Sequence, residues 1–185
     1  MGLVRPEIGR AADIEAGRRK AEVCVPCHGA NGDSTIPTTP SLAGQQPLYV
    51  FLQLIQFREK RRTDPQMSPF AEKLSDADME DIAAYYAAQK PFASRRAGDP
   101  AKVAAGRKVV DANHCASCHA PGLVGQKQMP RLVGQHYEYL LNQLRGFKAQ
   151  TRADIDGSMT TAAQPLSGQD IENLADYIAD LPATP

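Results

Sequence analysis

AEVCVPCHGANGDS occupies residues 21–34, and NHCASCHAPG, at residues 113–122, repeats its arrangement. In each stretch two residues separate a pair of cysteines, and a histidine directly follows the second cysteine. The chain contains 4 cysteines in total, and all of them belong to these two motifs, as Cys24, Cys27, Cys115 and Cys118. Any chemistry that the first C-x-x-C-H motif performs is therefore provided twice.

The sequence around the two motifs is also repeated. PSLAGQ at residues 40–45 recurs as PRLVGQ at residues 130–135, an offset of 90. The same offset relates Tyr49, Gln53, Leu54, Phe57 and Arg62 to Tyr139, Gln143, Leu144, Phe147 and Arg152. Such self-similarity predicts a tandem duplication of one small domain. We expect the first domain at 1–92, with 1–10 as an extension, a linker at 93–101 and the second domain at 102–185.

The spacing of apolar residues predicts an all-α fold. LSDADMEDIAAYYAAQK, from residue 74, and LSGQDIENLADYIADL, from residue 166, each place apolar residues at i, i+3, i+4 and i+7, which is one face of an amphipathic helix. A serine with an aspartate three residues later gives each helix a capping box. Further helices are expected at 11–24, 47–60, 101–113 and 137–149. Three helices per copy leave long loops, which are typical of functional segments.

Three kinds of chemistry compete for the cysteine pairs. A disulfide between residues three apart closes a very short loop and stabilises little. A shared zinc site would have to join motifs that lie 91 residues apart, far beyond the usual ligand spacing. The third is covalent haem attachment, in which the thiols bond to the porphyrin and the histidine reaches the iron. Two such motifs in a duplicated helical domain predict two haem c groups, with His28 and His119 as iron ligands.

Each iron also needs a second axial ligand or an open position. Met67 lies 39 residues after the first histidine, and Met159 lies 40 residues after the second. A thioether ligand favours electron transfer and raises the reduction potential. The alternative is that each methionine fills the core, but TDPQMSPF and DIDGSMTT are typical of loops. His136 is the other candidate ligand in the second copy, although a surface or capping role suits it better and its ligation would leave Met159 without a function.

The haem propionates need partners, because a buried carboxylate without a partner is costly. Arg62 and Arg152 occupy equivalent positions in the two copies, and so do Tyr49 and Tyr139. We expect these four side chains to bind propionates, together with Gln53 and Gln143. The alternative is that the arginines face solvent and the tyrosines pack in the core.

In combination these motifs resemble the di-haem cytochrome c4 family. The resemblance extends over about residues 11–182 and includes CVPCHGANGDS, PSLAGQ, MSPFAEKLSDADMEDIAAYYAAQK, CASCHAPG, PRLVGQ and LSGQDIENLADYIADL. It implies two class I cytochrome c domains packed face to face, with His/Met ligation by His28 and Met67 and by His119 and Met159. It also implies a periplasmic electron carrier, soluble or loosely associated with the membrane, that often delivers electrons toward a terminal oxidase.

The composition excludes several other classes of protein. Lys and Arg total 21, and so do Asp and Glu, which argues against a nucleic-acid-binding protein. No apolar run is long enough to span a bilayer. The N-terminal MGLVRPEIGRAADIEAGRRK lacks the apolar segment of a signal peptide, although covalent haem attachment usually follows export. We therefore expect the mature or engineered form of a periplasmic protein.

Three functions remain open at this point. In the first the protein shuttles electrons between redox proteins, with no small-molecule substrate and no enzymatic activity. In the second it is the di-haem cytochrome subunit of a flavocytochrome-type dehydrogenase. In the third it is a haem enzyme, such as a peroxidase, with one open iron. The third is disfavoured because neither copy offers a spare histidine near its methionine.

Overall fold

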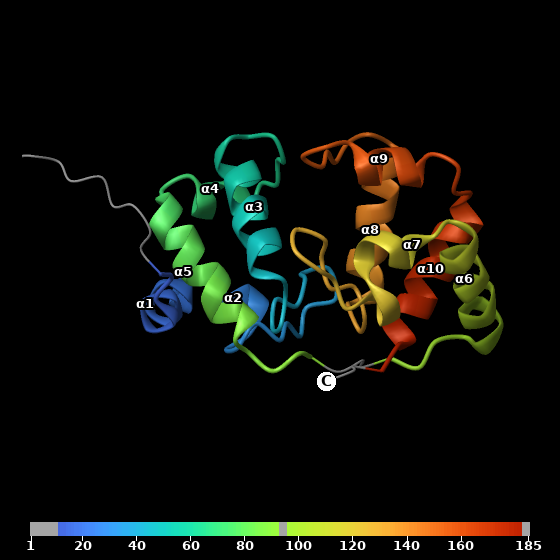
Figure 1. Cartoon of the computed structure of the whole chain (residues 1–185), viewed down its shortest axis with the longest axis horizontal. Helices are drawn as coiled ribbons and strands as arrows, with labels where there is room; N and C mark the ends of the chain where they lie inside the picture. The colour runs from blue at the N-terminus through green and yellow to red at the C-terminus, as the bar shows by residue number, and fades with distance from the viewer. Residues whose placement is uncertain (1–10, 93–95, 183–185) are drawn as a thin grey trace, which may run out of the picture.

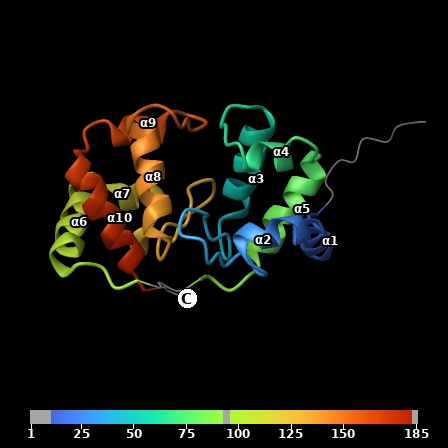
Figure 2. The same ribbon diagram turned by 180° about the vertical axis from the view of Figure 1, so that it is seen from behind.

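The computed structural model describes residues 11–92 and 96–182. The two halves of the chain form two groups of helices that lie side by side (Figure 1). The same division is visible from behind (Figure 2). The predicted extension at residues 1–10 lies outside the described residues, as does part of the predicted linker.

The helices confirm the all-α fold and its duplication. In the first half they are α1 (Ile14–Lys20), α2 (Val25–His28), α3 (Pro47–Arg58), α4 (Met67–Ala71) and α5 (Asp76–Ala87). Their counterparts are α6 (Pro100–Ala112), α7 (Cys115–His119), α8 (Tyr137–Lys148), α9 (Ser158–Ala163) and α10 (Gly168–Asp180). Short 3₁₀ turns lie at Ala21–Cys24 and Pro121–Leu123. Among the described residues, β pairing is limited to an isolated bridge between Gln126 and Met129.

The last helix of each half begins at the predicted capping box. The Ser75 hydroxyl accepts the N–H of Asp78, and the Asp78 carboxylate accepts the N–H of Ser75 in return. Ser167 and Asp170 make the same pair of bonds at α10. Asp99 caps α6 by accepting two backbone N–H groups, so that α6 begins two residues before the expected start of the second domain.

The first helix of each half crosses the last helix at a glycine. A Cβ at Gly17 would lie 2.0 Å from the carbonyl oxygen of Asp81, and a Cβ at Gly106 would lie 2.1 Å from that of Asn173. Because only glycine lacks a Cβ, the backbone of α1 can lie directly on α5, and that of α6 on α10. The cores next to these crossings include Ala21, Ile82 and Tyr86 in the first half and Val110, Leu174 and Ile178 in the second.

Met67 and Met159 lie in short helices, so the expectation of loops at these positions is wrong. Met67 begins α4, and Met159 is the second residue of α9. The carboxylate of Asp64 accepts the N–H of Met67 at 2.9 Å, and that of Asp154 accepts the N–H of Met159 at 2.7 Å. These aspartates satisfy N–H groups that the first turn of a helix leaves unpaired, and they favour a turn of helix despite the neighbouring Pro and Gly.

The two halves meet through α3, α8 and the loops that follow the C-x-x-C-H motifs. In Figures 1 and 2, α3 and α8 flank the middle of the molecule, and α1, α5, α6 and α10 lie on its outer sides. Each loop is fixed to the last helix of its own half, since Gly44 donates to the Tyr86 carbonyl at 2.9 Å and Gly134 donates to the Ile178 carbonyl at 3.1 Å. The fold is thus two domains packed face to face, as predicted.

Candidate functional site

A single continuous cavity is lined by residues from both domains. Its walls include Cys24, Cys27 and His28 of the first motif and His119 of the second. Both predicted axial methionines and all four predicted propionate partners also line it: Met67, Met159, Tyr49, Arg62, Tyr139 and Arg152. Cys115 and Cys118 are the predicted site residues that do not line this cavity. The structure therefore brings most of the predicted site together at the domain interface.

His28 and His119 are held in the same way at the ends of α2 and α7. Nδ1 of His28 lies 2.9 Å from the carbonyl oxygen of Pro40, and Nδ1 of His119 lies 3.0 Å from that of Pro130. A carbonyl can only accept, so Nδ1 donates and Nε2 keeps its lone pair. Burial lowers the pKa of both imidazoles, and the carbonyl contact opposes this only in part. Both rings are therefore neutral near pH 7, which is the form that binds a metal.

None of the four cysteines forms a disulfide, which leaves all four sulfurs for attachment to a cofactor. In each motif the first cysteine is partly buried and the second is exposed. Burial raises the pKa of the Cys24 and Cys115 thiols before attachment. Cys115 and Cys118 stand on α7, which ends with His119, and Cys115 packs against the core of the second domain.

Arg62 reaches from the first domain into the second. It donates to Oε1 of Gln53 in its own domain at 2.6 Å. Across the interface it donates to Oε1 of Gln143 at 3.0 Å and to the phenol oxygen of Tyr139 at 3.4 Å. Its guanidinium lies over the Phe57 ring, 4.6 Å from the ring centre. The solvent-facing alternative for this arginine is therefore wrong.

Arg152 makes the corresponding contacts in the opposite direction. It donates to Oε1 of Gln143 at 2.5 Å in its own domain, and to Tyr49 at 3.2 Å and Gln53 at 3.4 Å in the first domain. None of these acceptors is a carboxylate, and Nε of Arg152 is buried without a hydrogen-bond partner. Two cations thus share neutral acceptors inside the interface. Such an arrangement is unfavourable unless an anion joins it.

Two glutamines connect the domains through the backbone. Nε2 of Gln45 donates to the carbonyl of Arg131 at 3.0 Å, and its Oε1 accepts the N–H of Arg131 at 2.7 Å. Gln135 makes the same two bonds with Ser41, both at 3.0 Å. The two glutamine side chains are buried, so each pair of bonds is shielded from water. The interface therefore has an approximate two-fold symmetry.

Gln46 and His136 add a further symmetric pair of contacts. Nε2 of Gln46 donates to the carbonyl of Val124 at 3.3 Å, and Nε2 of His136 lies 2.9 Å from the carbonyl oxygen of Ser34. His136 is absent from the walls of the cavity that holds both predicted methionines. Nε2 of His136 contacts a carbonyl of the first domain, which disfavours the alternative in which His136 binds iron.

Gln45, Gln135 and Gln46 have no chemical signature in the sequence that predicts a function. A signal was present, because PSLAGQ and PRLVGQ both end in glutamine. Repetition alone cannot tell a contact within one copy from a contact between copies, and here each glutamine binds the other copy.

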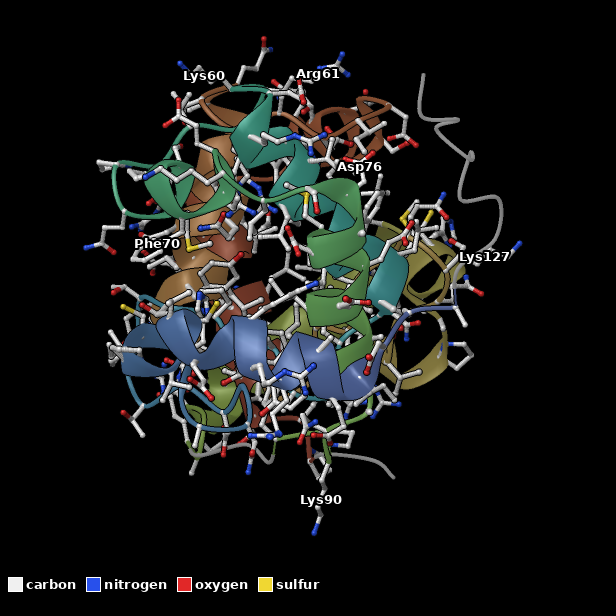
Figure 3. All side chains as sticks on the ribbon, turned by 90° about the vertical axis from the view of Figure 1, so that its left-hand side faces the viewer. Lys60, Arg61, Phe70, Asp76, Lys90 and Lys127 are labelled. Carbon is white, nitrogen blue, oxygen red and sulfur yellow. The ribbon has the colours of Figure 1, made fainter. Side chains whose placement is uncertain are left out.

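The cavity reaches the surface on the first domain. Val23 and Phe70 line it, yet their exposed fractions are 60% and 52%. Figure 3 shows Phe70 on the end of the molecule formed by the first domain. The equivalent positions of the repeat hold His114 and Ala162, which are not part of the lining. The exposed apolar rim is therefore a property of the first domain.

These residues fit two covalently attached haem groups. Each motif supplies two thiols and a neutral imidazole whose Nε2 is available, and the walls supply a methionine for each half. The remaining wall is largely apolar and includes Leu54, Phe57, Leu144 and Phe147, which suits a flat hydrophobic ring. The paired arginines suit the carboxylates at the ring edge.

Comparisons with known proteins agree with this site. Residues 103–182 match the family described as cytochrome c, and residues 12–85 match the family described as cytochrome C oxidase, cbb3-type, subunit III. The chain is 38% identical over 188 residues to a cytochrome c4 of Thiocapsa roseopersicina, with 95% of each chain covered. It is 31% identical to a thiosulfate dehydrogenase electron acceptor of Thiomonas intermedia (strain K12), with 94% of this chain and 85% of that protein covered. The crystal structure of reduced recombinant cytochrome c4 from Pseudomonas stutzeri matches with a TM-score of 0.86 at 36% identity, and covers 92% of this chain and 100% of that chain.

The fold, the two motifs and the shared cavity define a di-haem c-type cytochrome that transfers electrons. At the identity and coverage given above, the chain belongs to the cytochrome c4 family. The family resemblance, the duplicated cytochrome c fold and the two haem c cofactors are thereby confirmed.

Proposed function

We propose that the protein is a periplasmic electron carrier with no enzymatic activity, and that each haem iron is bound by one histidine and one methionine. His28 and Met67 serve the first haem, and His119 and Met159 serve the second. The covalent attachments are made by Cys24, Cys27, Cys115 and Cys118. The observation that carries this assignment is the pair of neutral histidines, each held through Nδ1 by a backbone carbonyl, beside a cavity that both methionines line.

When bound, the haem supplies one-electron chemistry between ferric and ferrous iron. The chain's own residues keep the ligands in place. The carbonyls of Pro40 and Pro130 set the orientation of the two imidazole rings, and Asp64 and Asp154 fix the backbone at the two methionines. Ligands that do not move between oxidation states keep the rearrangement on electron transfer small.

The propionates are assigned to the arginine network at the interface. Among the described residues, the hydrogen-bond acceptors of Arg62 and Arg152 include no carboxylate, and Tyr49 and Tyr139 lie within hydrogen-bond distance of them. Carboxylates from the haem groups would neutralise these cations and offset the cost of burying both. The network thereby binds the cofactors and joins the domains at the same place.

We also propose that the first domain occupies residues 1–92 and the second occupies residues 102–185.

A periplasmic location is supported by the chemistry of covalent haem attachment, which usually takes place outside the cytoplasm. Within residues 11–92 and 96–182, no helix has the length and apolar character that a membrane crossing requires.

The partners are redox proteins, with a respiratory donor and a terminal oxidase as the first proposal. The likeness to a thiosulfate dehydrogenase electron acceptor favours a dehydrogenase donor as the second candidate. A solved thiosulfate dehydrogenase (TsdBA) from Marichromatium purpuratum also matches, at 34% identity and a TM-score of 0.80, over 40% of that chain. In both cases the exposed apolar rim at Val23 and Phe70 is the surface that we expect the partner of the first domain to contact.

Optical spectroscopy of the pure protein, with haem quantified against protein, tests the proposal. We expect two covalent haems per chain, low-spin spectra and the weak far-red band of methionine-ligated ferric iron. Carbon monoxide added to the reduced protein should leave the spectrum unchanged. A carbon-monoxide-sensitive component would instead support a haem enzyme with one open iron.

A further inference from the structure

Two peptide groups, Pro40–Ser41 and Pro130–Arg131, each bind a histidine through the carbonyl and a glutamine of the other domain through the N–H. The carbonyl of Pro40, which accepts from Nδ1 of His28 at 2.9 Å, belongs to the same planar amide as the N–H of Ser41. That N–H donates to Oε1 of Gln135 at 3.0 Å. A continuous path therefore runs from the imidazole of the first domain, through one peptide group, to a side chain of the second domain.

The second domain repeats this path. Nδ1 of His119 lies 3.0 Å from the carbonyl oxygen of Pro130. The N–H of the same peptide group, on Arg131, donates to Oε1 of Gln45 at 2.7 Å. Each histidine is thus connected through one amide to a glutamine of the opposite domain, and both glutamines are buried.

We propose that Gln135 tunes the first haem through His28, and that Gln45 tunes the second haem through His119. This inference rests on the proposed function, in which both histidines bind iron. It makes the two glutamines positioning residues for electron transfer that act across the domain interface.

The direction of the effect follows from the polarisation of the amide. A hydrogen bond accepted from the amide N–H increases the negative charge on the oxygen of the same amide, because bonds in a chain strengthen one another. A more negative oxygen draws the Nδ1 proton more strongly and makes the imidazole a stronger donor to iron. A stronger donor favours the ferric state. Each glutamine therefore lowers the reduction potential of the haem in the other domain.

A purely structural role predicts a different pattern. Gln135 belongs to the second domain, and its neighbour His136 begins the segment leading into α8. If Gln135 only supported its surroundings, its loss would disturb the second haem most, or both haems to a similar extent. The peptide path instead predicts that the opposite haem responds alone.

The experiment measures the two reduction potentials separately in the holoprotein, by NMR-monitored redox titration of the assigned haem methyl groups. We expect Gln135→Met to raise the potential of the first haem and Gln45→Met to raise that of the second. The expected shift is up to about tenfold in the ferric-to-ferrous equilibrium, which is about 59 mV for one electron. The Nδ1–H resonance of the corresponding histidine should move to higher field, as a weaker hydrogen bond requires.

Two further variants distinguish the peptide path from general loosening of the interface. Gln135→Glu keeps an oxygen to accept from Ser41, so the potential of the first haem should stay at or below its wild-type value. Gln46→Ala removes a bond between the domains, to Val124. The peptide group of that carbonyl reaches only the backbone oxygen of His119 and neither imidazole nitrogen, so both potentials should remain unchanged.

The inference is overturned if Gln135→Met shifts the second haem instead, if Gln45→Met and Gln135→Met shift both haems equally, or if neither shifts any potential. It is also overturned if Gln46→Ala reproduces their effect. The wild-type spectrum tests the proposed function independently, because a protein without His/Met ligation fails before any glutamine is changed.

Discussion

The backbone N–H groups of Met67 and Met159 are each held by the side chain of an aspartate. In the ligation proposed above, a thioether is a weak ligand, and its binding to iron depends on the chain presenting the sulfur in the right place. Asp64 and Asp154 provide this by binding the methionine N–H groups at 2.9 and 2.7 Å. The same two aspartates convert segments that look like loops into the first turns of α4 and α9.

Replacing either methionine should affect one haem only. Met67→Ala is expected to lower the potential of the first haem by on the order of 0.1 V, a part of the roughly 0.8 V range that axial ligands span. It should also let carbon monoxide bind that haem in the reduced protein. Met159→Ala should do the same to the second haem. Potentiometry and carbon monoxide difference spectra check this, and two variants with wild-type spectra and potentials would refute the axial assignment.

The site residues that sequence could predict are those with a chemical signature. The C-x-x-C-H motifs and the repeated methionines predicted which residues face the cavity, and the structure places all but Cys115 and Cys118 along it. The hydrogen-bond partners of Arg62 and Gln135 could not be predicted in this way, because their acceptors lie in the other domain. Sequence offset gives equivalence between copies but carries no information on how the copies pack.

Within each domain the close crossing of the first and last helices depends on one glycine, Gly17 or Gly106. Gly17→Ala would place a Cβ 2.0 Å from a backbone oxygen of α5, and Gly106→Ala would do so at 2.1 Å from α10. Backbone cannot give way as a flexible side chain would, so each variant should lose about 1–3 kcal/mol of unfolding free energy, as overpacking typically costs. Denaturant unfolding of the holoprotein measures this. Gly168→Ala, with nothing within 4 Å of the added methyl group, is the matched control and should be close to neutral.

The junction of α1 and α5 carries a close ion pair at a position that is apolar in the second domain. Lys20 lies 2.6 Å from Asp78 and 2.8 Å from Asp81, whereas the equivalent of Lys20 is Val109. The hydrogen bond from Lys20, followed by those from Ser75, lowers the pKa of Asp78 to about 2. A depressed carboxyl pKa stabilises the fold at pH values above its unfolded value, 3.8, and this contribution is lost as the pH falls toward 2.

Asp78→Asn should therefore destabilise the first domain near neutral pH and lose its effect in acid. The expected cost is about 1 kcal/mol once solvent screening of this partly exposed pair is allowed for. Unfolding by urea, which does not screen charges, at pH 6 and at pH 2.5 checks the window. Asp170→Asn removes the same capping contact without an ion pair, so its cost should be smaller. An equal cost for both variants, or a cost for Asp78→Asn that does not change with pH, would contradict the assignment.

The element pattern was predictable because it depends on local signals. Apolar periodicity and the capping boxes predicted α5 and α10, and both begin directly after the expected serines. The short helices α4 and α9 were missed, since their stability comes from a single aspartate side chain and not from an apolar stripe.

The molecule as a whole is organised by a buried polar interface in place of an apolar one. Two glutamines bind backbone across it, and two arginines share acceptors from both domains. Buried polar bonds are directional, so they fix the relative position of the domains more strictly than apolar contact would. A fixed position is what rapid exchange of electrons between two haems requires.

Because each arginine contacts both domains, removing one should change both haem potentials. Arg62→Met and Arg152→Met delete a buried positive charge, which favours the more positive ferric state and lowers the reduction potentials. A buried unit charge is worth on the order of 1 kcal/mol or more at such sites. Lys60→Met and Arg61→Met are the matched controls, since these neighbours project into solvent (Figure 3) and their charges are screened. Separate titration of the two haems measures the result. A shift confined to one haem would mean that each arginine serves its own domain, and that the network joins the domains without joining their redox properties.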